Sequence, residues 1–146
     1  MIETVTSDNL EDVLPLVSQY QAFYKLADIS DERNRKFFSR FCGDNSLGCQ
    51  FLFRQEGKAV AFATVYFSFT SSIPAKVAVL NDLFTLADYR GKGIGRKLIE
   101  HCRGFARENG AARLQWLTAS DNQVAQHLYD SIGAGKSSWV FYTYPV

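Results

Sequence analysis

The stretch YRGKGIGRKLIEH (residues 89–101) places three glycines and four cationic side chains within eight residues, directly before an apolar helical pattern. Glycine lets a backbone turn sharply or come close to another group. Backbone N–H groups at the start of a helix attract anions, and the helix dipole adds to that attraction. The cations Arg90, Lys92, Arg96 and Lys97 would strengthen the same field. The stretch therefore predicts a strand-to-helix loop that binds an anion, with an ordinary helix start and solvated cations as the alternative.

Two common phosphate-binding patterns do not fit this stretch. A Walker A loop requires Gly-Lys-Ser/Thr, but Gly95 is followed by Arg-Lys-Leu, which gives little support for nucleotide hydrolysis. The dinucleotide fingerprint G-x-G-x-x-G, counted from Gly91, requires a glycine at the position of Arg96. The pattern that fits is R-x-x-G-x-G, over residues 90–95.

Hydrophobic periodicity and turn residues predict the elements on either side of the loop. The expected order is strand 2–5, helix 8–25, helix 30–43, strands 48–55 and 59–70, strand 76–85, helix 94–109, strand 113–119, helix 122–132 and strand 137–146. Residues 56–58 would close a hairpin between the second and third strands. This order predicts a mixed α/β or α+β sheet in a single domain over residues 1–146.

Composition narrows the class of protein. The chain has 146 residues, 47% of them hydrophobic, and a formal net charge of +1. Nucleic-acid and membrane-surface binding usually require a strong basic excess, so we expect neither. No signal peptide or membrane span is visible, and three cysteines without a CxxC pair favour reduced thiols in the cytoplasm. We expect no metal site.

Two segments together resemble a known family. DLFTLADYRGKGIGRKLIE (residues 82–100) is similar to motif A of the GNAT superfamily of acyl-CoA N-acyltransferases, although Ala87 replaces a proline frequent there. NQVAQHLYDSIGA (residues 122–134) is similar to that family's N-x-x-A-x-x-L-Y-x-x-x-G segment. The resemblance implies a six- to seven-stranded, mostly antiparallel sheet with helices on both faces. It also implies that the parallel strands 76–85 and 113–119 splay apart.

The same resemblance implies acetyl-CoA as the cosubstrate. Its pantetheine arm would enter between the splayed strands, and its pyrophosphate would lie on the glycine loop. The residues expected to bind it are Leu83, Phe84, Thr85, Arg90, Gly91, Lys92, Gly93, Ile94, Gly95, Arg96 and Asn122. Asn122 is equally explained as a helix cap.

The resemblance assigns the general acid to Tyr129, which would protonate the departing CoA thiolate. A core aromatic residue on an amphipathic helix is the alternative for Tyr129. The amine must also lose a proton, and spermidine/spermine-type relatives carry Glu-Asp where this chain has Asn81-Asp82. Because an amide cannot act as a base, we expect Asp82, or a water held by Asn81, to take that role. His101 and His127 are better explained as surface residues.

Charge and aromatic residues give an indication of the acceptor. Residues 1–75 hold seven basic and nine acidic side chains, and the acidic segment 27–32 is suited to a cationic amine. Tyr20, Phe23 and Tyr24 are candidates for lining its pocket, or simply form a core stripe. A polyamine, an amino acid, a lysine side chain and an amino sugar all remain open, as do the general base and the acyl preference. We expect direct transfer in a ternary complex within a homodimer. A non-catalytic acyl-CoA sensor and an interaction protein on an enzyme scaffold are the alternatives.

Overall fold

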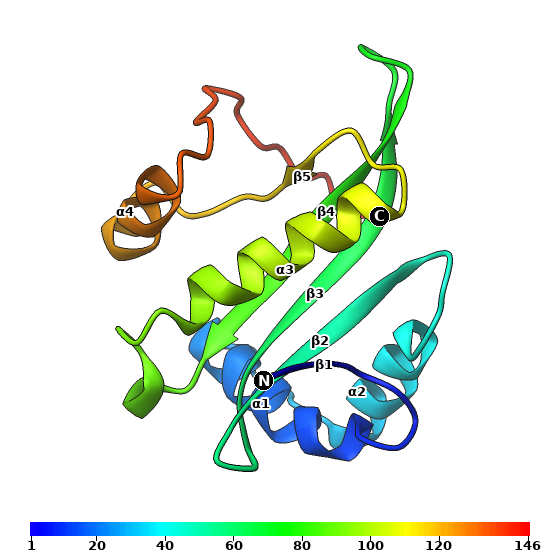
Figure 1. Ribbon diagram of the computed structural model, residues 1–146, viewed down its shortest axis with the longest axis vertical. Helices are drawn as coiled ribbons and strands as arrows, with labels where there is room; N and C mark the ends of the chain where they lie inside the picture. The colour runs from blue at the N-terminus through cyan, green and yellow to red at the C-terminus, as the bar shows by residue number, and fades with distance from the viewer. The chain divides into compact units, whose positions relative to one another are not determined.

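The computed structural model describes all 146 residues, and their contacts divide the chain into residues 1–116 and residues 117–146. We describe each unit by itself. The elements of the first unit, shown in Figure 1, are β1 (Ile2–Thr4), α1 (Leu10–Phe23), α2 (Asp31–Phe38), the 3₁₀ turn η1 (Ser39–Phe41), β2 (Gly48–Gln55), β3 (Lys58–Thr70), β4 (Ala75–Thr85), the 3₁₀ turn η2 (Ala87–Tyr89), α3 (Ile94–Glu108) and β5 (Leu114–Gln115).

The sheet confirms the expected mixed α/β class. Its order is β1-β2-β3-β4-β5, with every neighbouring pair antiparallel except β4 and β5, which are parallel. The hairpin between β2 and β3 turns at Glu56 and Gly57, both at positive φ. Gly57 lies at φ 78°, a conformation that glycine adopts without a steric penalty.

The expected strand count of six to seven is wrong, because the sheet has five strands. The strand expected over residues 113–119 is only Leu114–Gln115, and residues 137–146 form no strand. The apolar and aromatic pattern of 137–146 expresses β propensity, but a strand also requires a ladder partner. The aromatic side chains of this segment are exposed, as Trp139 (93%) and Tyr144 (94%) illustrate.

Helices cover both faces of the sheet, as expected. Successive strand residues point to opposite faces, so Phe51 and Leu52 mark the two sides. Leu52 belongs to a core cluster with the apolar residues of α1. On the other side, Phe51 contacts the rings of His101 and Phe105 from α3. Figure 1 shows α3 lying along the sheet.

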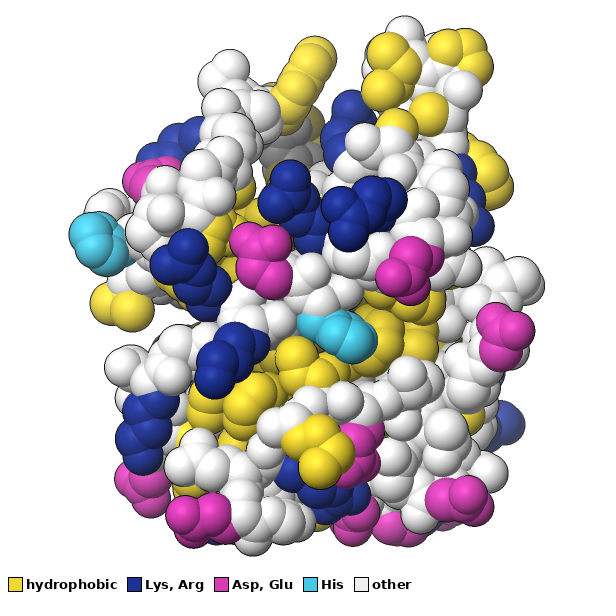
Figure 2. Space-filling model, in the orientation of Figure 1, with side chains coloured by type: hydrophobic (Ala, Val, Ile, Leu, Met, Phe, Trp, Pro, Cys, Tyr) yellow, Lys and Arg dark blue, Asp and Glu magenta, His cyan; other side chains and the backbone are white.

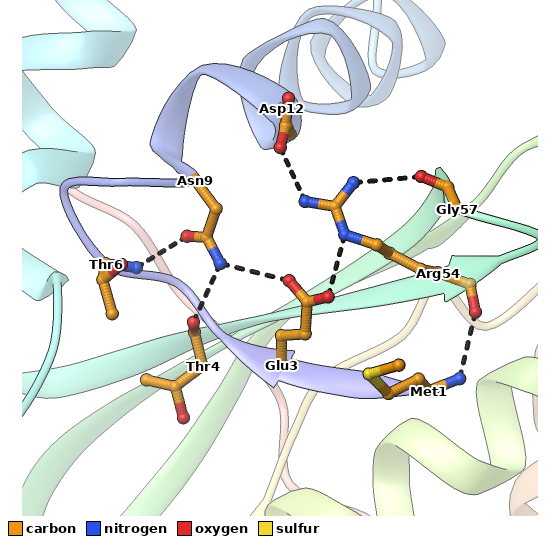
Figure 3. A network of polar contacts seen from close by, with 8 residues as sticks. All are labelled: Met1, Glu3, Thr4, Thr6, Asn9, Asp12, Arg54 and Gly57. Carbon is orange, nitrogen blue, oxygen red and sulfur yellow. Dashed lines mark hydrogen bonds and ion pairs between the residues drawn. The ribbon is translucent and has the colours of Figure 1, made fainter.

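Polar contacts join β1, α1 and β2 at one edge (Figure 3). Arg54 Nε donates to Glu3 Oε1 at 2.9 Å, and Arg54 Nη2 donates to Asp12 Oδ2 at 2.6 Å. Asn9 Nδ2 donates to Glu3 Oε2 at 3.2 Å, which links the loop before α1 to the same group. We call Glu3, Asp12 and Arg54 the Arg54 cluster. Its guanidinium faces two carboxylates, so each acidic side chain has a cation beside it.

The second unit contains one helix, α4 (Gln123–Ser131). Asn122 Oδ1 accepts a hydrogen bond from the backbone N–H of Ala125 at 3.1 Å, so Asn122 caps the helix. The helix ends before Gly133, at φ 80°. The helix predicted over residues 122–132 is therefore confirmed.

No helix is both long and apolar enough to cross a membrane. On the face shown in Figure 2, Lys and Arg side chains are interspersed with Asp and Glu.

Candidate active site

The parallel strand β5 pairs with only a short part of the outer edge of β4. β4 pairs with β5 only at Ala78↔Leu114 and Val79↔Gln115, and β4 then continues to Thr85. The outer edge of β4 over residues 80–85 therefore has no strand partner. Its unpaired N–H and C=O groups can bind an extended, amide-bearing ligand. The splay expected between strands 76–85 and 113–119 stays a prediction, because β5 ends at Gln115 and residues 117–119 belong to the second unit.

A bulge in β4 lies just beyond the residues that pair with β5. Thr64 is opposite Asp82, but the next residue of β3, Val65, is opposite Leu80, so Asn81 is the extra residue in β4. Bulges change the direction in which neighbouring side chains point. Here Asn81 is exposed, whereas Asp82 is only 5% exposed. The adjacent positions of the predicted Asn81-Asp82 pair thus have opposite environments.

Asp82 lies within a group of polar side chains on the α1 face of the sheet. Asp82 Oδ1 accepts a hydrogen bond from Asn81 Nδ2 at 3.1 Å, and the hydroxyls of Thr64 and Tyr20 also face the carboxylate as donors. Gln50 Nε2 donates to Thr64 Oγ1 at 3.3 Å. Since Thr64 accepts from Gln50, its own proton is available to Asp82. We call these five residues the Asp82 cluster.

The electrostatics of this cluster differ from those of a structural ion pair. Burial raises the pKa of Asp82, and the hydrogen bonds from Thr64, Tyr20 and Asn81 act in the opposite direction. All of these donors are neutral, and no Lys or Arg contributes to the shift. Asp82 Oδ2 is buried, and neither hydroxyl approaches it with the geometry of a full hydrogen bond. An incompletely satisfied buried carboxylate has a higher affinity for a proton.

Tyr20 is held protonated by its surroundings. Burial, followed by the nearby Asp82 charge, raises the pKa of Tyr20 well above its ordinary value. Its ring makes edge contacts with Phe62 and Phe84 at centroid distances of 5.7 and 6.1 Å. The role of Tyr20 in lining an acceptor pocket stays a prediction, whereas its hydroxyl faces Asp82 in the structure.

The glycine loop precedes a helix, as predicted. Gly91 and Gly93 lie at φ 73° and 77°, where other residues are strained. Gly93 is the N-cap of α3, no side chain caps this helix, and its first turn has no acidic residue. Lys92 and Arg96 are exposed beside it. Uncapped N–H groups with neighbouring cations have the properties of an anion site.

Arg90 makes contacts within the protein. Its Nε donates to the carbonyl of Thr85 at 2.9 Å, and its guanidinium lies 5.7 Å from the centre of the Phe84 ring. Arg90 therefore joins the glycine loop to the end of β4. Its role in binding pyrophosphate stays a prediction.

The remaining predicted residues lie in two places. Phe23 and Tyr24, at the end of α1, are 58% and 65% exposed and contact each other at a ring distance of 5.3 Å. Tyr129 and Asn122 belong to the second unit, where Tyr129 is partly buried on α4. The role of Tyr129 as general acid stays a prediction.

The sequence analysis did not identify Gln50 and Thr64. Both are fully buried, and each lies two positions from a buried apolar residue of its strand, Leu52 for Gln50 and Phe62 for Thr64. A polar residue at a core-facing strand position was the sequence signal that could have identified them. Such a side chain requires a hydrogen-bond partner, which indicates a buried polar cluster.

Known acetyltransferases are similar to this chain in sequence and in structure. The family model described as the acetyltransferase (GNAT) family matches residues 14–134. An uncharacterized N-acetyltransferase of Bacillus subtilis, YhfO, is 31% identical over 121 residues, which are 83% of this chain and 80% of the relative. The D-amino-acid N-acetyltransferase HPA3 of Saccharomyces cerevisiae is 33% identical over 129 residues, 87% of this chain and 79% of the relative. A crystal structure of a probable acetyltransferase superposes with a TM-score of 0.86 at 29% identity, over 100% of this chain and 97% of that one.

Proposed function

This chain belongs to the GNAT family of acetyltransferases, and from that premise we propose that it transfers the acetyl group of acetyl-CoA to a primary amine. The amine would attack directly while both substrates are bound. The observation that carries the proposal is the unpaired edge of β4, residues 80–85, which leads to the uncapped glycine loop at the start of α3. The amides of a pantetheine arm can pair with the open β4 edge, and the pyrophosphate anion can bind at the glycine loop.

The residues present fit acetyl-CoA. Main-chain groups of Leu83 and the N–H of Thr85 face the open edge, while those of Phe84 face β3, because the two orientations alternate along an antiparallel strand. The carbonyl of Thr85 already accepts from Arg90. Residues 90–96 offer helix N–H groups and cations for the pyrophosphate, with Asn122 as a further contact expected from the family. Acetyl-CoA supplies the acetyl group as a thioester, whose carbonyl carbon forms the new bond to nitrogen as the bond to sulfur breaks.

The chain's own residues would stabilise charge and move protons. A backbone N–H of the open β4 edge can donate to an oxyanion, and removal of comparable donors costs other enzymes about 3–4 kcal/mol. Tyr129 would protonate the CoA thiolate, since a phenol of ordinary pKa about 10 carries its proton at neutral pH. Asp82 would receive the proton lost by the amine.

Deprotonation of the amine is a substantial part of the barrier. A lysine-like amine has a pKa of about 10.4, so losing its proton at pH 7 costs about 4–5 kcal/mol. Asp82 is suited to the proton because burial raises its pKa and its Oδ2 lacks a full hydrogen bond. Asn81, exposed next to it, can orient the acceptor or a water but cannot take the proton.

The acceptor is proposed as a small molecule or peptide with a primary amine. One relative is named for D-amino acids, which makes an amino acid a first choice for the panel. Phe23 and Tyr24 offer exposed rings, and the segment 27–32 offers carboxylates for a cation. A single domain over residues 1–146, a cytoplasmic location and a homodimer remain predictions.

The test is release of CoA thiol from acetyl-CoA with a panel of amines: D- and L-amino acids, spermidine, a lysine peptide and an aminoglycoside. Amine-dependent release would support transfer and identify the acceptor class. We expect Tyr129→Phe to lower kcat about 10²-fold or more if it is the acid. Tight acetyl-CoA binding without release for any amine would contradict the proposal for this panel and favour the sensor.

Binding of the cosubstrate is tested separately with Gly93→Val. A β-branched residue is strained at φ 77°, and its side chain would project where a phosphate would approach the helix N–H groups. We expect acetyl-CoA affinity to fall at least tenfold by calorimetry. The control is Gly110→Val, which carries similar strain at φ 76° at the far end of α3. Equal loss in both variants would indicate a general folding defect.

A further inference from the structure

The carboxylate of Asp82 has no direct access to a bound amine. Its side chain is 5% exposed, on the α1 face of the sheet, beneath the half-buried ring of Tyr20. If Asp82 is the base of the proposed function, on which this inference rests, a proton must reach it through another group. The donors around Asp82 are Thr64, Tyr20 and Asn81.

Only one of these donors combines exposure with suitable chemistry. Thr64 is fully buried, and its oxygen already accepts a hydrogen bond from Gln50, so Thr64 has no contact with a substrate. Asn81 is exposed, but an amide does not exchange protons as an acid or base at neutral pH. Tyr20 is only partly buried, and its hydroxyl faces Asp82 as a donor.

We propose that Tyr20 is a catalytic residue that passes the proton of the acceptor amine to Asp82. The N–H bond of the ammonium breaks, and its proton goes to the phenolic oxygen of Tyr20. At the same time the O–H bond of Tyr20 breaks, and that proton goes to a carboxylate oxygen of Asp82. Tyr20 ends neutral as it began, Asp82 becomes neutral, and the amine nitrogen keeps its electron pair for attack.

The surroundings of both groups suit this transfer. Burial and the negative charge of Asp82 raise the pKa of Tyr20, so the phenolate does not accumulate and the hydroxyl remains a donor. No cation faces Asp82, so nothing of opposite charge favours its ionised form over its protonated form. The other titratable groups beside the pair are the phenols of Tyr24, at the end of α1, and Tyr66 on β3.

Gln50 and Thr64 act as positioning residues behind this pair. Because Gln50 Nε2 donates to Thr64 Oγ1, the hydroxyl proton of Thr64 is directed to Asp82 rather than to the amide. Both side chains are fully buried, so their arrangement does not depend on solvent. They fix one side of the carboxylate while Tyr20 approaches from α1.

The experiment compares pH profiles of kcat for wild type, Tyr20→Phe and Tyr66→Phe, with acetyl-CoA and the best amine of the panel. Tyr20→Phe retains the ring contacts but removes the relay and one donor that lowers the pKa of Asp82. We expect its maximal kcat to fall about tenfold or more, and its acidic limb to move to higher pH. Tyr66→Phe removes a phenol on the same face that does not donate to Asp82, so its profile should match wild type.

Several outcomes overturn the inference. A wild-type profile in Tyr20→Phe, or the same change in Tyr66→Phe, would show that Tyr20 carries no proton. A lower kcat with an unmoved acidic limb would indicate a packing role. If wild type itself releases no thiol with any amine, the proposed function fails first.

A second measurement does not require turnover. Difference infrared titration of wild type against Asp82→Asn reports protonation of the Asp82 carboxyl. Repeated in the Tyr20→Phe and Thr64→Val backgrounds, it should show protonation at higher pH than in wild type, because each change removes a donor. Unchanged titration in both backgrounds would contradict the hydrogen bonds on which the relay depends.

Discussion

The Arg54 cluster and the Asp82 cluster use acidic side chains in opposite ways. In the Arg54 cluster, one guanidinium lies 2.9 Å from Glu3 and 2.6 Å from Asp12 at an edge of the sheet (Figure 3). In the Asp82 cluster, a buried carboxylate faces only neutral donors, and its Oδ2 lacks a full hydrogen bond. The first cluster is charge-compensated, and the second is not.

This difference separates a structural role from a chemical one. Compensated charges join β1, α1 and β2 without leaving a polar atom that reacts readily. Burying a carboxylate without a cation lowers the stability of the folded protein. Such carboxylates are found mostly at functional sites, where a raised affinity for a proton serves the chemistry. The predictions below change one cluster at a time and compare the effects on activity and on unfolding.

The largest expected effect is on catalysis in Asp82→Asn. Asparagine keeps the shape of the side chain but cannot take a proton, so we expect kcat to fall by about 10²- to 10⁴-fold. The acidic limb of the pH profile should also disappear. The thiol-release assay checks both. A near wild-type kcat would show that another group is the base. The Asp82 cluster would then have no chemical role to set against the structural role of the Arg54 cluster.

The same substitution should affect stability in the opposite direction. Because burial raises the folded pKa of Asp82, its stabilising contribution is complete below the unfolded pKa of about 3.9 and is lost as pH rises through the folded pKa. Asp82→Asn should therefore match wild type near pH 4 and exceed its unfolding free energy by about 1–3 kcal/mol at pH 8. Urea unfolding at several pH values measures this. A variant less stable than wild type at pH 8 would mean that the ionised carboxylate is well accommodated.

Removing the cation of the Arg54 cluster should have a smaller effect, and on stability alone. Arg54→Met leaves Glu3 and Asp12 without a cation beside them, and we expect the melting temperature to fall by about 2–4 °C. The kcat should remain at the wild-type level, since the cluster lies outside the proposed site. Calorimetry and the thiol-release assay measure the two quantities. A selective loss of kcat in a folded Arg54→Met protein would remove the distinction between the clusters.

The sequence predicted most of the fold because its local signals agree. The start of α2 after Ser30, the hairpin at 56–58 and the end of α3 before Gly110 all match the structure, since each depends on residues near one another. The short β5 and the absent strand over 137–146 could not be predicted from propensity, because pairing depends on distant partners.

The candidate site was predictable only in part for the same reason. The glycine loop and Asp82 could be found from motifs along the chain. The convergence of Tyr20, Gln50 and Thr64 on Asp82 depends on strand register and on the packing of α1, which bring together residues up to 62 positions apart. The bulge at Asn81, which separates the environments of two adjacent residues, leaves no signal of its own in the sequence.

The smallest expected effect belongs to an exposed pair that serves as the control for Arg54. Arg35 Nε donates to Glu11 Oε1 at 2.5 Å between α1 and α2, but both side chains are about half exposed. Exposed ion pairs contribute little and are screened by salt, so Arg35→Met should shift the melting temperature by less than about 1 °C. The pH dependence also has the opposite sign to that of Asp82. The hydrogen bond from Arg35 lowers the folded pKa of Glu11, so its contribution is present above the unfolded pKa and is lost as pH falls through the folded pKa. Melting of wild type and Arg35→Met should therefore coincide in acid and differ only slightly at neutral pH. A shift as large as that of Arg54→Met would show that exposure does not distinguish these ion pairs.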